Sequence, residues 1–182
     1  DLVQSPGSGT SAEVPFSQAS GAAVYLRHTW GSKVPSFYER PLENHTAYAY
    51  TWIYSPENCS AGLHFSTHNY GRSELDATPP AGSWDYKFSR VWLNGESVIP
   101  PEWGNAGVKS GYEIPYSGEN MWNRLPVKVY LRKGWNSIVI KLPVGRFTSQ
   151  ETRLVKWMFT AMIVTADGSK KPERLVYSLN RF

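Results

Sequence analysis

Aromatic and apolar side chains recur at every second position along several stretches of this chain, which is the spacing of β-strands. Between residues 46 and 54 they are Tyr48, Tyr50, Trp52 and Tyr54, so one face of the predicted strand carries all four rings. We expect these rings to lie in the core. Residues 86–93 alternate in the same way, and residues 156–165 are apolar on both faces, as in a central strand. Shorter strand-like runs lie at residues 63–65, 98–99, 127–131, 137–142 and 175–177, the last as an edge strand.

Turn sequences separate these runs. The pair Asn94-Gly95 predicts a hairpin that returns through residues 98–99, because both central residues of such a turn need a positive φ. Residues 133–136 and the pair Asp167-Gly168 predict two further turns. No segment carries a sustained helical stripe with caps, so any helix is expected to be short. About eight short strands with such turns predict an all-β fold, an antiparallel β-sandwich or jelly roll.

Length and composition fit one domain. At 182 residues the chain can bury a single core. Residues 1–20 are rich in Ser, Gly and Pro and lack periodicity, so we expect a linker or the end of a preceding domain there, and the sandwich over residues 21–182. The single cysteine, Cys59, excludes an internal disulfide. No apolar run approaches the about 20 residues of a membrane span, and no signal-peptide pattern opens the chain.

Charge is distributed unevenly along the chain. Residues 1–122 hold 7 Lys/Arg against 12 Asp/Glu, and residues 123–182 hold 12 against 3. A basic segment can attract nucleic acid or acidic glycans. Several of these lysines fall in strand-like stretches, however, where a solvated outer face explains them. No helix-turn-helix, zinc finger or aromatic RNA-binding motif accompanies them, so no nucleic-acid partner is expected.

Loop sequences between the strands combine large aromatic rings with fixed polar groups. A pyranose stacks its apolar face on a ring and bridges its hydroxyls to Arg, Asp or Asn, so this combination favours a sugar-binding site. The candidate ligand-binding residues are Arg72, Asp76, Trp84, Asp85, Trp103, Asn120, Trp122 and Arg124. In the alternative interpretation, the charged residues lock loops through ion pairs, and Trp84 belongs to the core.

Several ungapped blocks resemble the C-terminal region of family 20 β-N-acetylhexosaminidases from Bacteroidetes. The blocks are Ala23–Gly31, Asn44–Pro56, Asn69–Ser73, Gly134–Asn136, Lys141–Gly145 and Arg153–Thr160, and the likeness covers roughly residues 22–178. It implies a galactose-binding-like accessory sandwich beside a separate catalytic barrel. Such a domain would belong to a longer precursor that is secreted, periplasmic or associated with the outer membrane. Its implied partners are that barrel and glycans with terminal GlcNAc, GalNAc or galactose.

Catalysis by this chain is not expected. Hydrolysis in that family is substrate-assisted and needs an Asp-Glu dipeptide, yet none of Asp1, Asp76, Asp85 and Asp167 precedes a Glu. His64 and His68 are four positions apart, which on one strand puts them about 13 Å from each other, too far to chelate one metal. No cofactor is expected, and without an Asp-rich loop a structural calcium ion is only an open alternative. The predicted function is a carbohydrate-binding accessory domain; the alternative is a support or dimerisation domain that packs on the catalytic barrel.

Overall fold

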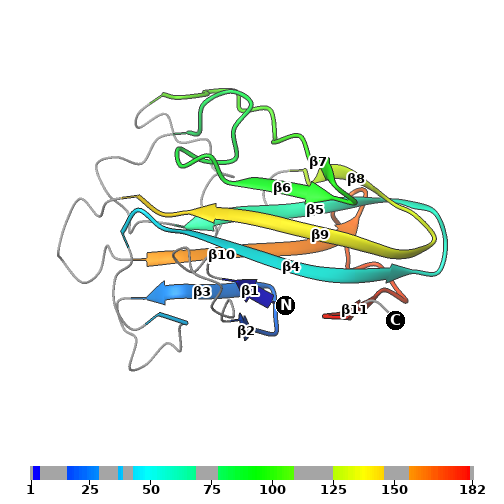
Figure 1. Cartoon of the computed structure of the whole chain (residues 1–182). Coiled ribbons are helices and arrows are strands. Elements are labelled where there is room, and N and C mark those ends of the chain that lie inside the picture. The colour runs from blue at the N-terminus through cyan, green and yellow to red at the C-terminus, as the bar shows by residue number, and fades with distance from the viewer. Residues whose placement is uncertain are drawn as a thin grey trace.

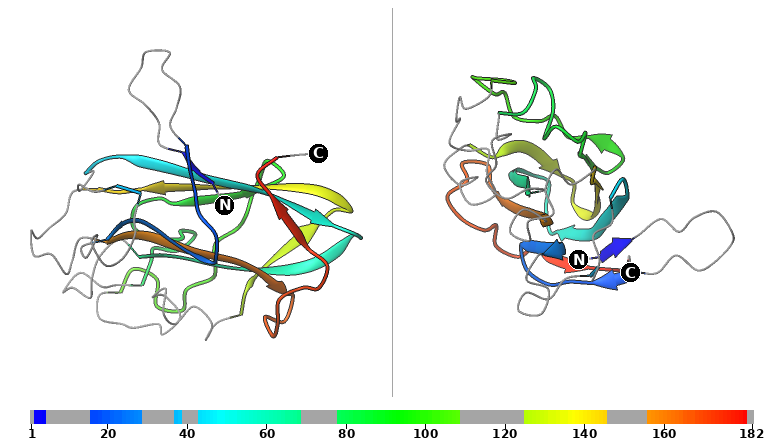
Figure 2. Two further views of the ribbon diagram at one scale, coloured as in Figure 1. Left: turned by 90° about the horizontal axis from the view of Figure 1, so that it is seen from below. Right: turned by 90° about the vertical axis from the view of Figure 1, so that its left-hand side faces the viewer.

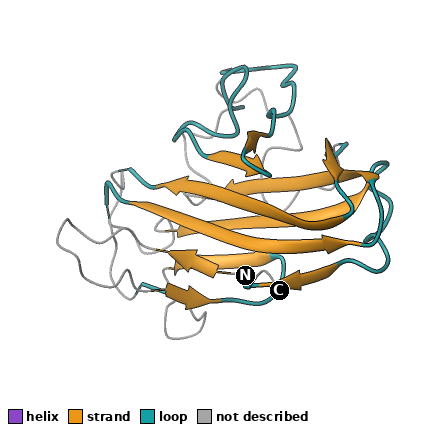
Figure 3. Ribbon diagram, turned by 45° about the vertical axis from the view of Figure 1, so that its right-hand side comes forward, coloured by secondary structure: helices purple, strands orange, loops and turns teal. Residues whose placement is uncertain are grey.

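The chain forms two β-sheets packed face to face, as the ribbon of the computed structural model shows (Figure 1). The structure describes residues 2–4, 16–28, 37–38, 43–68, 78–108, 125–145 and 156–180. Within these residues all regular elements are strands, eleven in number, and no helix occurs (Figure 3). All pairings between these strands are antiparallel. The predicted all-β fold and antiparallel sandwich are therefore confirmed.

The larger sheet has the strand order β2-β1-β4-β9-β6-β7, and β11 also pairs with β4. Its strands are β1 (Leu2–Gln4), β2 (Phe16–Gln18), β4 (Thr46–Ser55), β6 (Arg90–Leu93), β7 (Glu96–Ser97), β9 (Gly134–Pro143) and β11 (Val176–Ser178). Strands β4 and β9 pair along all ten of their residues, from Thr46 opposite Pro143 to Ser55 opposite Gly134. On the other edge of β4, β1 pairs with residues 48–50 and β11 with residues 52–54, so Thr51 lies between them.

The smaller sheet has the order β3-β10-β5-β8. Its strands are β3 (Ala23–His28), β5 (Cys59–His68), β8 (Val127–Leu131) and β10 (Lys156–Thr165). Strand β10 lies between β3 and β5, which confirms residues 156–165 as a central strand. The views of Figure 2 show the two sheets as separate layers, with the core between them. Core side chains come from both layers, among them Leu26, Ile53, Phe65, Ile140 and Trp157.

The prediction that the four rings of β4 lie in the core is wrong. Burial alternates along the strand: Ala47, Ala49 and Ile53 face the interior, whereas the rings lie half-buried on the outer face of the larger sheet. Tyr and Trp combine an apolar ring with a polar group, and such amphipathic side chains suit half-buried positions.

The opening residues also differ from the sequence prediction. Residues 2–4 and 16–18, which the composition assigned to a linker, form β1 and β2 and extend the larger sheet beside β4. Residues 86–89 form no strand, so the predicted strand 86–93 is reduced to β6. The Asn94-Gly95 hairpin is confirmed, with φ of 53° and 82° at the two residues, but it returns through residues 96–97 and not through 98–99. The turn predicted over residues 133–136 is shorter, because β9 begins at Gly134, and it makes no hairpin, because β8 and β9 belong to different sheets.

Candidate functional site

Three of the eight predicted ligand-binding residues lie in the described part of the chain. They are Trp84, Asp85 and Trp103, in the segment that leads into and out of the β6–β7 hairpin. The other five, Arg72, Asp76, Asn120, Trp122 and Arg124, lie outside the described residues. Glycan binding through any of the eight therefore stays a prediction, and only the local surroundings of the first three are known.

Asp85 is a buried carboxylate with four hydrogen bonds. Its Oδ2 accepts from the hydroxyls of Thr67 at 2.7 Å and Ser89 at 2.6 Å. Its Oδ1 accepts from the backbone N–H groups of Lys87 at 2.9 Å and Ser89 at 3.0 Å. These bonds fold residues 85–89 into a tight loop and attach it to β5. The arrangement favours the loop-locking alternative for Asp85.

Trp84 and Trp103 are also buried. The ring of Trp84 is 5% exposed and meets Phe65 edge to face, with centroids 5.0 Å apart. Trp103 is 9% exposed, and its indole N–H donates to the carbonyl of Ser83 at 2.8 Å. A ring needs one open face to stack a sugar. Their burial therefore favours a scaffold role for both residues.

A second group of aromatic rings, less buried than Trp84 and Trp103, lies on the outer face of the larger sheet. Half-buried aromatic side chains from β4, β6 and β9 meet there, and we call them the outer aromatic face: Tyr48, Tyr50, Trp52, Tyr54, Trp92 and Trp135. Rings two residues apart on β4 repeat every ~7 Å, so the four of that strand extend over about 20 Å.

The strand register places the rings of the three strands side by side. Tyr54 lies opposite Trp135, and their rings make an edge contact with centroids 5.4 Å apart. Val139 of β9 lies opposite both Tyr50 on one side and Trp92 on the other. The outer aromatic face therefore extends across three strands, with Val139 between Tyr50 and Trp92.

Polar groups lie among and beside these rings. Lys141 lies opposite Tyr48 on one neighbouring strand and Arg90 on the other, which puts two cationic side chains at one end of the face. Ser137 lies opposite Trp52 near the other end. A surface of flat rings with donors at its edges can stack the apolar side of sugar rings and bind their hydroxyls.

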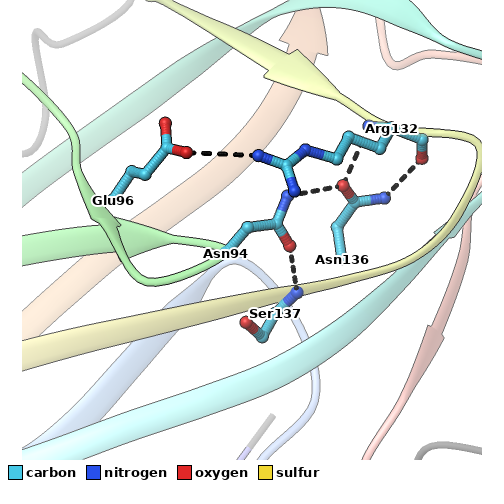
Figure 4. Close-up of polar contacts among 5 residues, drawn as sticks. All are labelled: Asn94, Glu96, Arg132, Asn136 and Ser137. Atoms are coloured by element: carbon cyan, nitrogen blue, oxygen red, sulfur yellow. Dashed lines mark hydrogen bonds and ion pairs between the residues drawn. The ribbon is translucent and has the colours of Figure 1, made fainter.

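A buried amide network fixes the β6–β7 hairpin against β9 (Figure 4). The Oδ1 of Asn136, a fully buried residue, accepts from the amide of Asn94 at 2.8 Å and from the backbone N–H of Arg132 at 2.9 Å. Asn94 Oδ1 in turn accepts from the backbone N–H of Ser137 at 3.0 Å. The guanidinium of Arg132 donates to Glu96 at 3.1 Å. These contacts attach the turn of the hairpin to the start of β9.

Two perturbed ionisable groups lie away from the outer aromatic face. Burial lowers the pKa of the Lys87 ammonium, and the nearby charge of Asp85 opposes that shift. Hydrogen bonds from the Thr165 hydroxyl and from Ser169 lower the pKa of Asp167 to about 2. Both groups lie in loops that join strands.

Among the described residues, no group of three or more His, Cys, Asp or Glu side chains is arranged to hold a metal ion. The same part of the chain contains no helix long and apolar enough to cross a membrane. Comparisons of the chain with protein-family models, with curated proteins and with solved structures each found no match.

Sequence reasoning found the stripe of rings on β4 but assigned it to the wrong side of the sheet. The residues between the rings are the buried ones, and they include Ile53 as well as alanine, threonine and serine, so their size alone did not show which face is the inner one.

Proposed function

We propose that this chain is a non-catalytic carbohydrate-binding domain and that the outer aromatic face holds the glycan. The observation that carries the proposal is the row of half-buried rings on β4, continued by Trp135 on the neighbouring strand β9 and by Trp92 on β6 beyond it. These rings are mounted on a paired sheet rather than on loops, so little conformational freedom is lost when a ligand stacks on them.

The proposed mode of binding is stacking with hydrogen bonds at the margin. Successive pyranose rings lie along β4 over the aromatic side chains, with their axial C–H groups toward the ring faces. Lys141 and Arg90 bind hydroxyl or carboxylate oxygens at one end, and Ser137 binds hydroxyls near the other. A single site of this kind binds a sugar weakly, and we expect a dissociation constant of ~1 mM.

The resemblance to family 20 β-N-acetylhexosaminidases supplies the biological setting of the proposal. In that setting the chain is a galactose-binding-like jelly roll attached to a catalytic barrel in a secreted, periplasmic or outer-membrane-associated enzyme. Its glycans are chains with terminal GlcNAc, GalNAc or galactose. A sandwich that binds such a glycan raises the effective substrate concentration at the barrel without catalysing any reaction itself.

A second candidate function is support of the catalytic domain, or dimerisation, through an apolar contact. The observation in its favour is the exposure of large apolar side chains near the β6–β7 hairpin: Phe88 is 68% exposed and Ile99 is 79% exposed. A packing surface on another domain would cover such groups.

A glycan array with matched variants tests the proposed function. Wild-type chain and Tyr130→Ala, which removes a 54% exposed ring from the smaller sheet, are expected to retain the same glycans. Trp52→Ala and Trp135→Ala are expected to lose them. Absence of any competable signal from folded wild-type chain would contradict carbohydrate binding and favour the support function. Equal retention by all four proteins would move the site away from the outer aromatic face.

A further inference from the structure

A cavity of about 680 Å³ lies between the two sheets, on the inner side of β4. Its deep walls are apolar side chains from both layers: Val24, Ile53, Leu63, Ile138, Ile140, Phe159 and Ile163. Protein interiors are normally packed without voids larger than a water molecule. A space of this size is instead typical of a small-molecule site.

Two alanines help to leave this space open. Ala161 lies opposite Phe65 in the pairing of β10 with β5, so it points toward the core, yet it remains partly exposed. Ala49 lies on the facing sheet and also lines the cavity. A larger residue at either position would project into the space. The cavity therefore follows from the choice of small residues on facing strands.

The mouth of the cavity lies beside Thr51, where β1 and β11 leave a gap along the edge of β4. Its rim consists of residues 18–22, which lead into β3, and of residues 177–180 with Lys171. Polar groups gather here, in contrast to the interior. The Thr51 hydroxyl donates to the Ser178 carbonyl at 3.2 Å, which attaches the closing segment to β4.

The rim carries one cation and no carboxylate among the described residues that line it. The ammonium of Lys171 lies 5.7 Å from the centre of the Tyr177 ring, which holds the charge beside the mouth. Burial raises the pKa of the Tyr177 phenol, so its hydroxyl stays protonated and able to donate near neutral pH. An anionic group at the mouth would meet a positive charge and a hydrogen-bond donor.

We propose that this cavity binds an amphiphile with an unbranched aliphatic chain and a single anionic end group, such as a medium-chain carboxylate. The chain occupies the space between Ala49 and Ala161, and the carboxylate lies at Lys171. The proposal goes beyond glycan binding and concerns the inner side of the larger sheet. A sugar does not fit the same space, because the apolar walls offer nothing to its hydroxyls.

The proposed site can be separated from the outer aromatic face. Among the described residues that line the cavity, Tyr50 is the one member of that face. Trp52→Ala is therefore expected to abolish glycan retention while leaving the amphiphile site intact. The two proposals can fail independently of each other.

Calorimetric titration of the 182-residue chain with decanoate and with 1-decanol, both below their aggregation limits, tests the proposal. We expect saturable 1:1 binding of decanoate. Lys171→Gln should lower the affinity for decanoate about tenfold, because a charge-assisted contact is lost. The affinity for decanol should not change. Lys128→Gln, which changes an exposed lysine on β8, is the matched control and should bind both probes like wild type.

A second experiment fills the cavity with a larger side chain. Ala161→Phe is expected to abolish binding of both probes, with circular dichroism and thermal unfolding as the check on folding. If that variant does not fold, Ala49→Val replaces it, with a smaller loss expected. The proposal is overturned if wild type shows no saturable binding, or if a folded filling variant binds like wild type. If Lys171→Gln and Lys128→Gln lowered the affinity for decanoate equally, the role of Lys171 would be overturned.

Discussion

The indole of Trp135 meets the ring of Tyr54 edge to face across the β4–β9 pair, with ring centroids 5.4 Å apart. This contact joins the rings of two strands on the outer side of the larger sheet. Edge-to-face pairs of this kind contribute about 0.5–1.5 kcal/mol beyond the area that they bury. The pair holds both rings in fixed orientations at one end of the outer aromatic face.

Removing the Asp85 carboxylate should destabilise the domain. In Asp85→Asn the amide can no longer accept from the Thr67 and Ser89 hydroxyls and both backbone N–H groups at once. Hydrogen bonds to a buried charged group are the strong ones, so we expect a loss of about 2–3 kcal/mol in the free energy of unfolding. Urea denaturation measures it, with Glu102→Gln, at an exposed site, as the control. A change as small as the control's would refute the anchoring role.

The amide network at Asn136 should control the β6–β7 hairpin. Asn136→Ala leaves the backbone N–H of Arg132 and the amide of Asn94 without their shared acceptor. We expect a loss of about 2–3 kcal/mol in stability, together with faster hydrogen exchange in β6. Exchange measured by mass spectrometry should show the increase in residues 90–97 and little change in β10. Uniform acceleration over both sheets would show that the network does not act locally.

Asp167 should make stability depend on pH in the acid range. Its pKa falls from an ordinary value of 3.8 to about 2 in the folded chain, because Thr165 and Ser169 donate to the carboxylate. A depressed folded-state pKa stabilises the fold above the unfolded value, and that contribution is lost as pH falls from about 4 to about 2.

The measurement is the unfolding free energy of wild type and Asp167→Asn at pH 6 and at pH 2. Wild type should be more stable at pH 6, and most of the difference should be lost at pH 2, where about half of the folded-state carboxyls are protonated. A difference that persists unchanged at pH 2 would contradict the role of the ionised carboxylate.

Phe88 should be replaceable by glycine without loss of stability. Its backbone has a φ of 61°, which is unfavourable for a residue with a side chain, and its ring is 68% exposed. Left-handed backbone costs a non-glycine residue roughly 1–2 kcal/mol, so Phe88→Gly should keep or raise the melting temperature. A clear fall in the melting temperature would show that the ring packs against the protein. If Phe88→Gly impaired attachment to a catalytic domain, that result would favour the support function.

Local features of the fold could be predicted from the sequence. The Asn94-Gly95 turn follows from the preference of these residues for positive φ, and both adopt it. The central place of β10 follows from apolar residues on both of its faces. Both features depend on short stretches of sequence alone.

Features that depend on distant partners could not be predicted. Alternation along β4 shows that four rings share a face but does not say which face meets the other sheet. Residues 86–89 have a strand-like pattern, yet the carboxylate of Asp85 folds them into a loop through contacts with β5. Strands β8 and β9 are separated by a short turn and still enter different sheets.

The candidate site also depends on contacts between distant residues that the sequence did not reveal. Composition and loop position indicated exposed rings near polar groups, but Trp84 and Trp103 are buried by contacts with Phe65 and Ser83. The outer aromatic face combines side chains of three strands, and the pairing that places Trp135 beside β4 and Trp92 on the next strand is visible only in the fold.

The most direct test of glycan binding on the outer aromatic face is a titration of the 15N-labelled chain with a retained glycan, observed at the indole N–H signals of the eight tryptophans. We predict that the signals of Trp52, Trp92 and Trp135 shift together and saturate, whereas those of the buried Trp84, Trp103 and Trp157 do not move. Shifts confined to other tryptophans, with Trp52, Trp92 and Trp135 unchanged at saturation, would contradict the proposed site.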